Sequence, residues 1–427
     1  MTADAVRRYM HMAEQRIGAA FLAERLHCHL AAGWQGPHTL TFSVKLYQPT
    51  APNIAKAMRL GPAVEAMLGD GPVRIASQAG TILVETPSPW PVAVESARLR
   101  GQGLAVPVGI SGRRTVEGID LGDPNQAHIL AVGPSGRGKT TALRSIAFHL
   151  ARQNLPSQVR LLAITFKPAD WRAVADLSHS WPMITDATEA EVALTALAEE
   201  VANRARLQVA EPHILIIVDD LLNLLALVNV GDQLGQIASL GRSAGVHLAI
   251  GTQRLGKRGA GDVAVTSNIS TRMVFGTTDA ADAAFFTGRA DSGAEVLGRH
   301  PGDCLLVRDG QTIRLAAARV ADGDLDSLPR SGPRYVRVWQ PSSRGGGGGS
   351  AQKRPESPAE TPSEALSTAN TTTTTPPPDA EAERKARIKA LAASGKSKSA
   401  ICMEEFGYKD TRTYRIVAEA LKEEVSA

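Results

Sequence analysis

His128-Ile-Leu-Ala-Val-Gly133-Pro-Ser-Gly136-Arg-Gly138-Lys139-Thr140 joins an apolar run, a glycine-rich loop and the start of a helix. The run Ile129–Val132 is typical of a buried strand, and Thr141–Arg152 is typical of a helix. Between them lies G-x-x-x-x-G-K-T, the pattern of a phosphate-binding P-loop in the context that such a loop needs. Its glycines let backbone N–H groups surround phosphate oxygens, and the helix N-terminus adds a positive dipole end.

This loop predicts a site for ATP and Mg²⁺. Lys139 is expected to reach the β- and γ-phosphates, and the Thr140 hydroxyl is expected to bind Mg²⁺. The nucleotide contacts are expected from the whole loop: Gly133, Pro134, Ser135, Gly136, Arg137, Gly138, Lys139, Thr140 and Thr141.

Composition and charge are those of a globular protein without a membrane span. The 427 residues are enough for two or three domains, and the formal charge of +4 does not by itself predict a nucleic-acid partner. Cys28, Cys304 and Cys402 lie too far apart for a zinc site or a disulfide framework, which favours a cytoplasmic location. The apolar runs are well short of the ~20 residues that cross a bilayer.

The region before the loop predicts a helix and then a small α+β module. Apolar residues recur at helical spacing between residues 3 and 32, so residues 1–37 are interpreted as an N-terminal helix. The module is placed at residues 38–122. Its expected strands are Thr39–Tyr47, Val73–Ala76, Thr81–Thr86 and Leu104–Ile110, with a helix over Ile54–Leu68.

Alternating strands and helices from residue 123 to residue 340 predict a RecA-like P-loop ATPase domain of the α/β class. Such βα repetition favours a mainly parallel sheet with helices on both faces. The expected strands are Ile129–Val132, Val159–Thr165, Ile214–Val218, Val246–Thr252, Met273–Phe275, Asp303–Arg308 and Thr312–Ala316.

Beyond the ATPase domain the composition changes twice. Residues 341–380 are rich in Gly, Pro, Ser and Thr and are interpreted as a disordered linker. Residues 381–427 predict three short helices that form a helix-turn-helix DNA-binding domain, with ten basic and six acidic side chains between Arg384 and Ala427. The third helix would present Thr411, Arg412, Thr413 and Arg415 to a major groove. A small helical protein-interaction domain with solvated charges is the alternative.

A second nucleotide-binding signature is Ile214-Leu-Ile-Ile-Val218-Asp219-Asp220. A buried strand that ends in two acids is typical of a Walker B segment, in which Asp219 would hold Mg²⁺ and Asp220 would be the catalytic base. Gln253 follows another expected strand, where its side chain can sense the γ-phosphate.

The stretch from Arg242-Ser-Ala-Gly-Val-His-Leu248 to Thr252-Gln253-Arg254 resembles the FtsK/SpoIIIE family of double-stranded DNA translocases. Members carry a similar R-x-x-G-[IV]-H-L and T-Q-R in this order. Other landmarks agree: Phe166-Lys167-Pro168, Asn268-Ile-Ser-Thr-Arg272, Gly293-Ala-Glu295 and Gly302-Asp303. The likeness covers roughly Thr39 to Val307, and the C-terminal helices match the position of the family's DNA-reading domain.

The resemblance implies a homo-oligomer, a hexameric ring around duplex DNA, with each ATP site completed by an arginine of the neighbouring subunit. Arg242 matches the family position of this catalytic arginine; Arg272 and Arg289 are weaker candidates, and Arg242 could instead cap a helix. The sequence departs from the family pattern at two places. It has Asp279-Ala-Ala281 where family members tend to carry Asp-Ser-Arg, and Phe166 where they usually carry an acid. These differences are expected to affect subunit and DNA contacts more than hydrolysis. The family's membrane-spanning region is not found in the sequence, so anchoring at a septum is not expected.

A ring motor also needs basic loops along its channel, because grip on phosphates is electrostatic. The candidates are Arg254, Lys257 and Arg258 in a glycine-rich segment, although a plain surface loop has the same composition. The sequence thus favours an ATP-driven DNA translocase of a plasmid, mobile element or virus. An ATP-dependent DNA-binding partition or regulatory switch, and a secretion or coupling ATPase of the same superfamily, are the alternatives.

Overall fold

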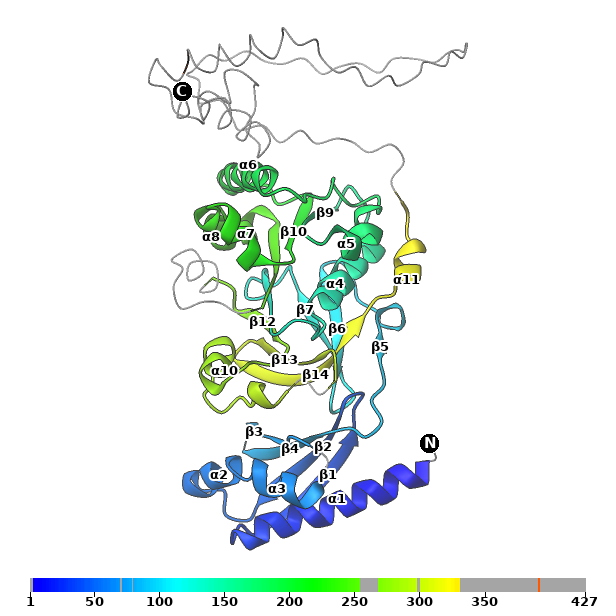
Figure 1. Ribbon diagram of the computed structural model, residues 1–427, viewed down its shortest axis with the longest axis vertical. Helices are drawn as coiled ribbons and strands as arrows, with labels where there is room; N and C mark the ends of the chain where they lie inside the picture. The colour runs from blue at the N-terminus through cyan, green and yellow to red at the C-terminus, as the bar shows by residue number, and fades with distance from the viewer. Residues whose placement is uncertain are drawn as a thin grey trace, which may run out of the picture. The chain divides into compact units, whose positions relative to one another are not determined.

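The computed structural model describes residues 3–69, 71–78, 80–253, 268–297, 300–330 and 391. The chain divides into two compact units, Met1–Ser342 and Ser343–Ala427. The first unit contains a four-stranded sheet with its helices and a ten-stranded sheet with helices on two faces (Figure 1). Apart from Leu391, the predicted linker and helix-turn-helix lie outside the described residues. No helix of the described part of the chain is long and apolar enough to span a bilayer.

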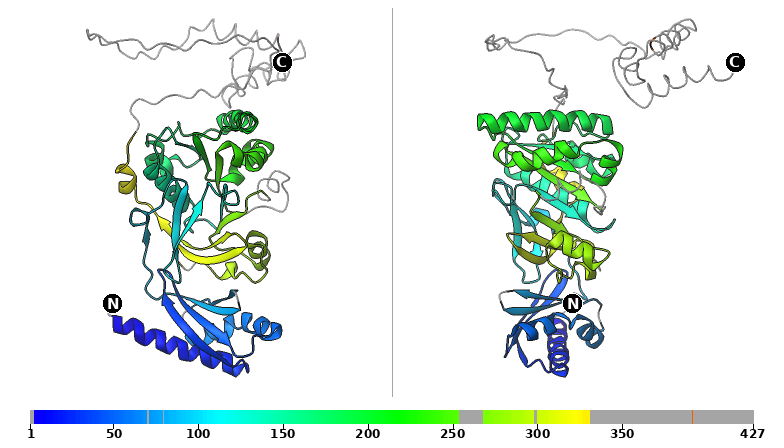
Figure 2. Two further views of the ribbon diagram at one scale, coloured as in Figure 1. Left: turned by 180° about the vertical axis from the view of Figure 1, so that it is seen from behind. Right: turned by 90° about the vertical axis from the view of Figure 1, so that its left-hand side faces the viewer.

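The four-stranded sheet is antiparallel throughout, in the order β1-β2-β4-β3. Three helices cover one of its faces (Figure 2), and they bury Phe21 and Phe42 in a common core with Ile17 and Val64. The elements are α1 (Ala3–Ala23), β1 (Cys28–Gln35), β2 (Thr39–Leu46), α2 (Ala51–Met58), α3 (Gly61–Leu68), β3 (Arg74–Gln78) and β4 (Thr81–Pro87).

Two helix predictions in this region are wrong. The first helix does not reach residue 32, because the chain turns at Arg25 with a left-handed φ of 58° and continues as β1. The helix expected over Ile54–Leu68 is divided into α2 and α3. Pro62 lies in the first turn of the second helix, which begins at Gly61. A missing N–H is tolerated there, whereas it would interrupt a continuous helix.

The ten-stranded sheet is mixed, in the order β7-β6-β14-β13-β12-β8-β11-β10-β9, with β5 paired to β14. The prediction of a mainly parallel sheet holds for β12, β8, β11, β10 and β9, whereas β13, β14, β6 and β7 pair antiparallel. Its strands are β5 (Val94–Glu95), β6 (Ala105–Ser111), β7 (Val116–Asp120), β8 (Ile129–Val132), β9 (Val159–Ile164), β10 (His213–Val218), β11 (Val246–Thr252), β12 (Thr271–Val274), β13 (Asp303–Arg308) and β14 (Gln311–Arg319). The strand expected at Leu104–Ile110 therefore belongs to this sheet.

Helices lie on both faces of the parallel half, because alternate residues of each buried strand point to opposite sides. Leu130 and Ile216 face α6, α7 and α8, whereas Ile129 and Ile217 face α4 and α5 (Figure 1). The helices are α4 (Lys139–Gln153), α5 (Pro168–Ala175), α6 (Ala187–Leu207), α7 (Leu221–Leu227), α8 (Gly231–Leu240), α10 (Ala280–Thr287) and α11 (Asp322–Asp326).

Candidate functional site

The glycine-rich loop connects the carboxyl end of β8 to the first residue of α4. Gly138 has a φ of 105°, which side chains other than glycine rarely adopt, and a Cβ there would lie 3.2 Å from the amide nitrogen of Gly302. The Gly302 amide also donates a hydrogen bond to the carbonyl of Arg137 at 2.9 Å. The segment before β13 therefore supports the glycine-rich loop through this hydrogen bond. The N-terminus of α4 faces the phosphate site.

Lys139 lies folded against the loop that precedes it. Its Nζ donates to the carbonyl oxygens of Gly133 at 2.7 Å and Pro134 at 2.9 Å. Burial lowers the pKa of Lys139, while the negative charges of Asp219 and Asp220 act in the opposite direction. The Lys139 ammonium is therefore desolvated and bonded to neutral carbonyl oxygens. A phosphate can replace these carbonyls as the hydrogen-bond partner, and its charge makes it the stronger acceptor.

Thr140 and Asp219 are in direct contact. The Thr140 hydroxyl donates to Asp219 Oδ1 at 2.7 Å, and the two residues come from the start of α4 and the end of β10. A hydroxyl and a carboxylate are hard oxygen ligands of the kind that Mg²⁺ prefers together with substrate phosphates. The donor set therefore fits Mg²⁺, which would polarise the phosphate oxygens when bound.

Asp220 has a second, structural role that the sequence did not reveal. Its side chain caps α7 by accepting from the Asn223 backbone N–H at 3.5 Å, and its Oδ2 accepts from the Asn223 side-chain amide at 2.7 Å. Asn223 was missed as a site residue, although the spacing D-x-x-N at a strand-to-helix junction is a capping signal. Asn223 fixes the direction of the carboxylate predicted to be the catalytic base.

Gln253 and Lys167 stand at the same edge of the sheet as the P-loop. Gln253 follows β11, whose last residue Thr252 accepts from the Gly133 amide at 3.3 Å. Lys167 follows β9 and is exposed, and its positive charge adds to the effect of burial in lowering the pKa of Lys139. The sequence identified Lys167 only as part of a family landmark, although its position after a parallel strand could have marked it.

The contacts described for the candidate arginines lie in other parts of the fold. Arg242 is exposed in the short turn Gly241–Ala244 that precedes β11, and the amino ends of parallel strands lie at the edge opposite their carboxyl ends. Arg272 donates to the carbonyls of Phe285 and Phe286, each at 3.0 Å, and so supports the end of α10. Arg289 lies 3.7 Å from Asp291.

The predicted DNA contacts cannot be placed. Arg254, Lys257 and Arg258, like Thr411, Arg412, Thr413 and Arg415, lie outside the described residues.

A strand, a glycine-rich loop and a helix follow one another around Lys139. Asp219, at the end of a parallel strand, is hydrogen-bonded to Thr140. Together these features define an α/β P-loop ATPase fold. The profile of the FtsK/SpoIIIE family matches residues 93–210 of the chain. This match confirms the resemblance that the sequence motifs predicted.

Similar proteins agree with this result. The chain is 25% identical over 257 residues to the DNA translocase FtsK of Streptococcus pneumoniae, covering 53% of this chain and 33% of the relative. It is 27% identical over 337 residues to the DNA translocase SftA of Bacillus subtilis, covering 69% of this chain and 34% of the relative. The chain thus spans about a third of the length of these relatives. A solved structure of the pCW3 conjugation coupling protein TcpA, a monomer form with ATPγS, shares the fold with a TM-score of 0.50 at 18% identity, over 73% of this chain and 96% of that one.

Proposed function

We propose that the protein is an ATP-driven translocase of double-stranded DNA that acts in the transfer, segregation or maintenance of a plasmid or mobile element. The observation that carries the proposal is the 2.7 Å hydrogen bond between Thr140 and Asp219, which unites the P-loop and the Walker B strand in one site. The family match and the relatives named DNA translocases support the choice of duplex DNA as the track.

Each residue of the site has a distinct task in hydrolysis. Lys139 neutralises the β- and γ-phosphates, and Thr140 and Asp219 hold Mg²⁺. Asp220, oriented by Asn223, accepts a proton from the attacking water, and Gln253 responds to the presence of the γ-phosphate. Because Lys139, Thr140, Asp219, Asp220 and Gln253 all lie at the carboxyl edge of the parallel strands, the state of the bound nucleotide would affect the ends of these strands.

The site is completed in a ring of identical subunits, which we infer to be hexameric. Arg242 is exposed at the opposite edge of the sheet, so it is available to a neighbour and not to the Lys139 of its own chain. In trans it would stabilise charge on the transferred phosphoryl group, an effect of ~10³-fold or more in rate in enzymes that use such an arginine. Arg254, Lys257 and Arg258 would contact DNA phosphates, and the helix-turn-helix of residues 381–427 would recruit the motor to DNA.

The test is the steady-state ATPase rate with and without duplex DNA. The wild-type protein should be stimulated by DNA, and Thr140→Ser, which keeps a hydroxyl, should retain most of the rate. Thr140→Val, which has the same shape without the hydroxyl, and Lys139→Ala should both be inactive. A wild-type rate that DNA leaves unchanged would count against the proposal.

A DNA-binding switch with slow hydrolysis is the second candidate, and the Asp220–Asn223 contact is the observation that favours it. A carboxylate engaged by a side-chain amide at 2.7 Å is less free to approach water. In a switch, Asn223→Ala should raise kcat by releasing Asp220. In the proposed motor, the same change should lower kcat, because the base loses its fixed direction.

A further inference from the structure

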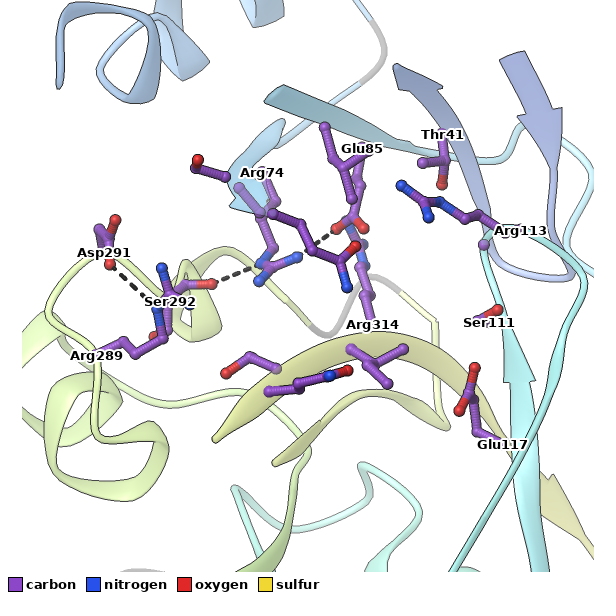
Figure 3. A pocket seen from close by; sticks show the side chains of 18 of the residues that line it. Thr41, Arg74, Glu85, Ser111, Arg113, Glu117, Arg289, Asp291, Ser292 and Arg314 are labelled. Carbon is purple, nitrogen blue, oxygen red and sulfur yellow. Dashed lines mark hydrogen bonds and ion pairs between the residues drawn. The ribbon is translucent and has the colours of Figure 1, made fainter. Parts of the chain in front are cut away.

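A pocket of about 560 Å³ lies where the four-stranded sheet meets the antiparallel half of the ten-stranded sheet (Figure 3). Its walls come from β3 and β4 on one side and from β14, the turn between β6 and β7, and residues 289–292 on the other. None of the P-loop residues 133–141 lines it. Its volume is within the range of sites that hold small organic ligands.

The pocket is lined by more cations than anions. Five arginines face three carboxylates, which gives the described lining a formal charge of +2. These residues are Arg74, Arg113, Arg289, Arg308 and Arg314, with Glu85, Glu117 and Asp291. The net positive charge of this wall attracts an anion. Its carboxylates can accept hydrogen bonds from hydroxyl and amino groups of a ligand, and their negative charge disfavours a highly charged polyanion.

Ion pairs hold the inner wall in place. Arg74 donates from Nη1 to Glu85 at 2.6 Å and from Nε to the Ser292 carbonyl at 2.6 Å, so it joins the four-stranded sheet to the segment that follows α10. Arg314 makes two parallel hydrogen bonds to Asp303 at 2.9 and 2.8 Å. These bonds position the arginine side chains of the wall without a ligand, which reduces the entropic cost of binding.

Two buried polar atoms of the lining are left without partners in the described part of the chain. They are Nη1 of Arg314, whose residue is 3% exposed, and the hydroxyl of Thr41, whose residue is 1% exposed. Glu85 Oε2 is 3.9 Å from that Nη1, beyond hydrogen-bond length. Buried polar atoms are nearly always hydrogen-bonded, and leaving one without a partner is unfavourable, so these atoms mark where a ligand would bind.

Arg113 provides a third donor at the rim. Its guanidinium stacks over the Trp34 ring at 5.1 Å and, in Figure 3, is directed toward Thr41. Within the described residues it has no carboxylate partner, unlike the other arginines of the lining. The planar fork of an arginine held in this way matches a phosphate oxygen pair.

We propose that this pocket binds a nucleoside monophosphate. Arg113 and Nη1 of Arg314 bind the phosphate, the Thr41 hydroxyl adds a further hydrogen bond, and Glu85 or Glu117 accepts from hydroxyl or amino groups of the remainder. A ligand here contacts both sheets at once, so its binding favours the arrangement in which they are joined.

Binding is tested with AMP, GMP, CMP and UMP as separate probes on the full-length protein carrying Lys139→Ala, which disables the phosphate site of the P-loop. Isothermal titration calorimetry should detect one of the four, bound as a single molecule per chain. Arg113→Gln should weaken that binding by roughly tenfold or more. Arg114→Gln is the matched control, because Arg114 is the exposed neighbour that does not line the pocket, and it should leave binding unchanged.

Two results would overturn the proposal. One is that none of the four monophosphates binds at about 1 mM. Another is that Arg114→Gln weakens binding as much as Arg113→Gln, which would indicate unspecific attraction by surface charge. If no monophosphate binds and Arg113→Gln reduces affinity for duplex DNA, the first result would also make this surface part of the DNA path. Both variants are exposed rim changes, so folding is checked by an unchanged melting temperature.

Discussion

Replacing Asp303 by leucine should destabilise the protein severely, because it leaves the guanidinium of Arg314 in the interior without its main partner. Asp303 accepts two hydrogen bonds from Arg314, and the side chains are 1% and 2% exposed. The nearest remaining carboxylate, Glu85, is 3.9 Å from Nη1 and is already bound to Arg74. Breaking one side of such a buried pair costs about 3–5 kcal/mol, a large part of a typical free energy of unfolding.

The double variant Asp303→Leu with Arg314→Met separates the cost of an unpaired charge from the cost of a changed shape. Since a buried ion pair replaced by apolar groups is nearly neutral, the double variant should recover most of the loss. The free energy of unfolding is measured by urea titration, followed by far-UV circular dichroism. A single variant that loses less than about 1 kcal/mol, or a double variant as unstable as the single one, would refute the reasoning.

Trp171→Ala should lower the free energy of unfolding by about 3–5 kcal/mol, because Trp171 is fully buried and the change leaves a large cavity; urea titration measures the loss. His128→Asn should flatten the dependence of stability on pH. Burial lowers the pKa of His128 to about 4, and its Nδ1 accepts from the Leu248 amide at 3.0 Å, so the stabilisation is complete above about pH 6.5 and is lost as pH falls toward 4. The stability lost between about pH 7 and pH 5 should shrink by ~2 kcal/mol in the variant, measured by urea titration at both pH values; an unchanged loss would contradict this. Gly138→Ala should raise the KM for ATP, because its Cβ would crowd the Gly302 amide at 3.2 Å and strain the phosphate loop; an unchanged KM would contradict this reading.

Buried parallel strands were the most predictable elements. The expected bounds of β8 and β11 agree with the structure residue for residue, because strands covered on both faces are continuous apolar runs. β1 was missed, since Cys28–Gln35 is an edge strand with half-exposed and exposed residues and carries little apolar signal. Pairing with β2 stabilises this strand, and pairing between distant residues is not encoded in local composition.

The antiparallel half of the large sheet could have been found from one turn. Asp309-Gly310 joins β13 to β14 with positive φ at both residues, 49° and 70°, as the type I′ turn of a two-residue hairpin requires. The two strands were nevertheless expected in a mainly parallel sheet. At the site, the P-loop and Asp219 follow from motif and strand order, whereas the Asn223 contact depends on side-chain placement that the sequence indicates only as a capping pattern.

The central claim, movement along duplex DNA driven by ATP, is tested most directly by displacement of a third strand from naked duplex DNA. The wild-type protein with ATP should release the third strand, and Lys139→Ala should bind the same DNA without releasing it. Addition of ATPγS in place of ATP should also abolish release. Wild-type protein that hydrolyses ATP in the presence of DNA yet never displaces the third strand would contradict the account.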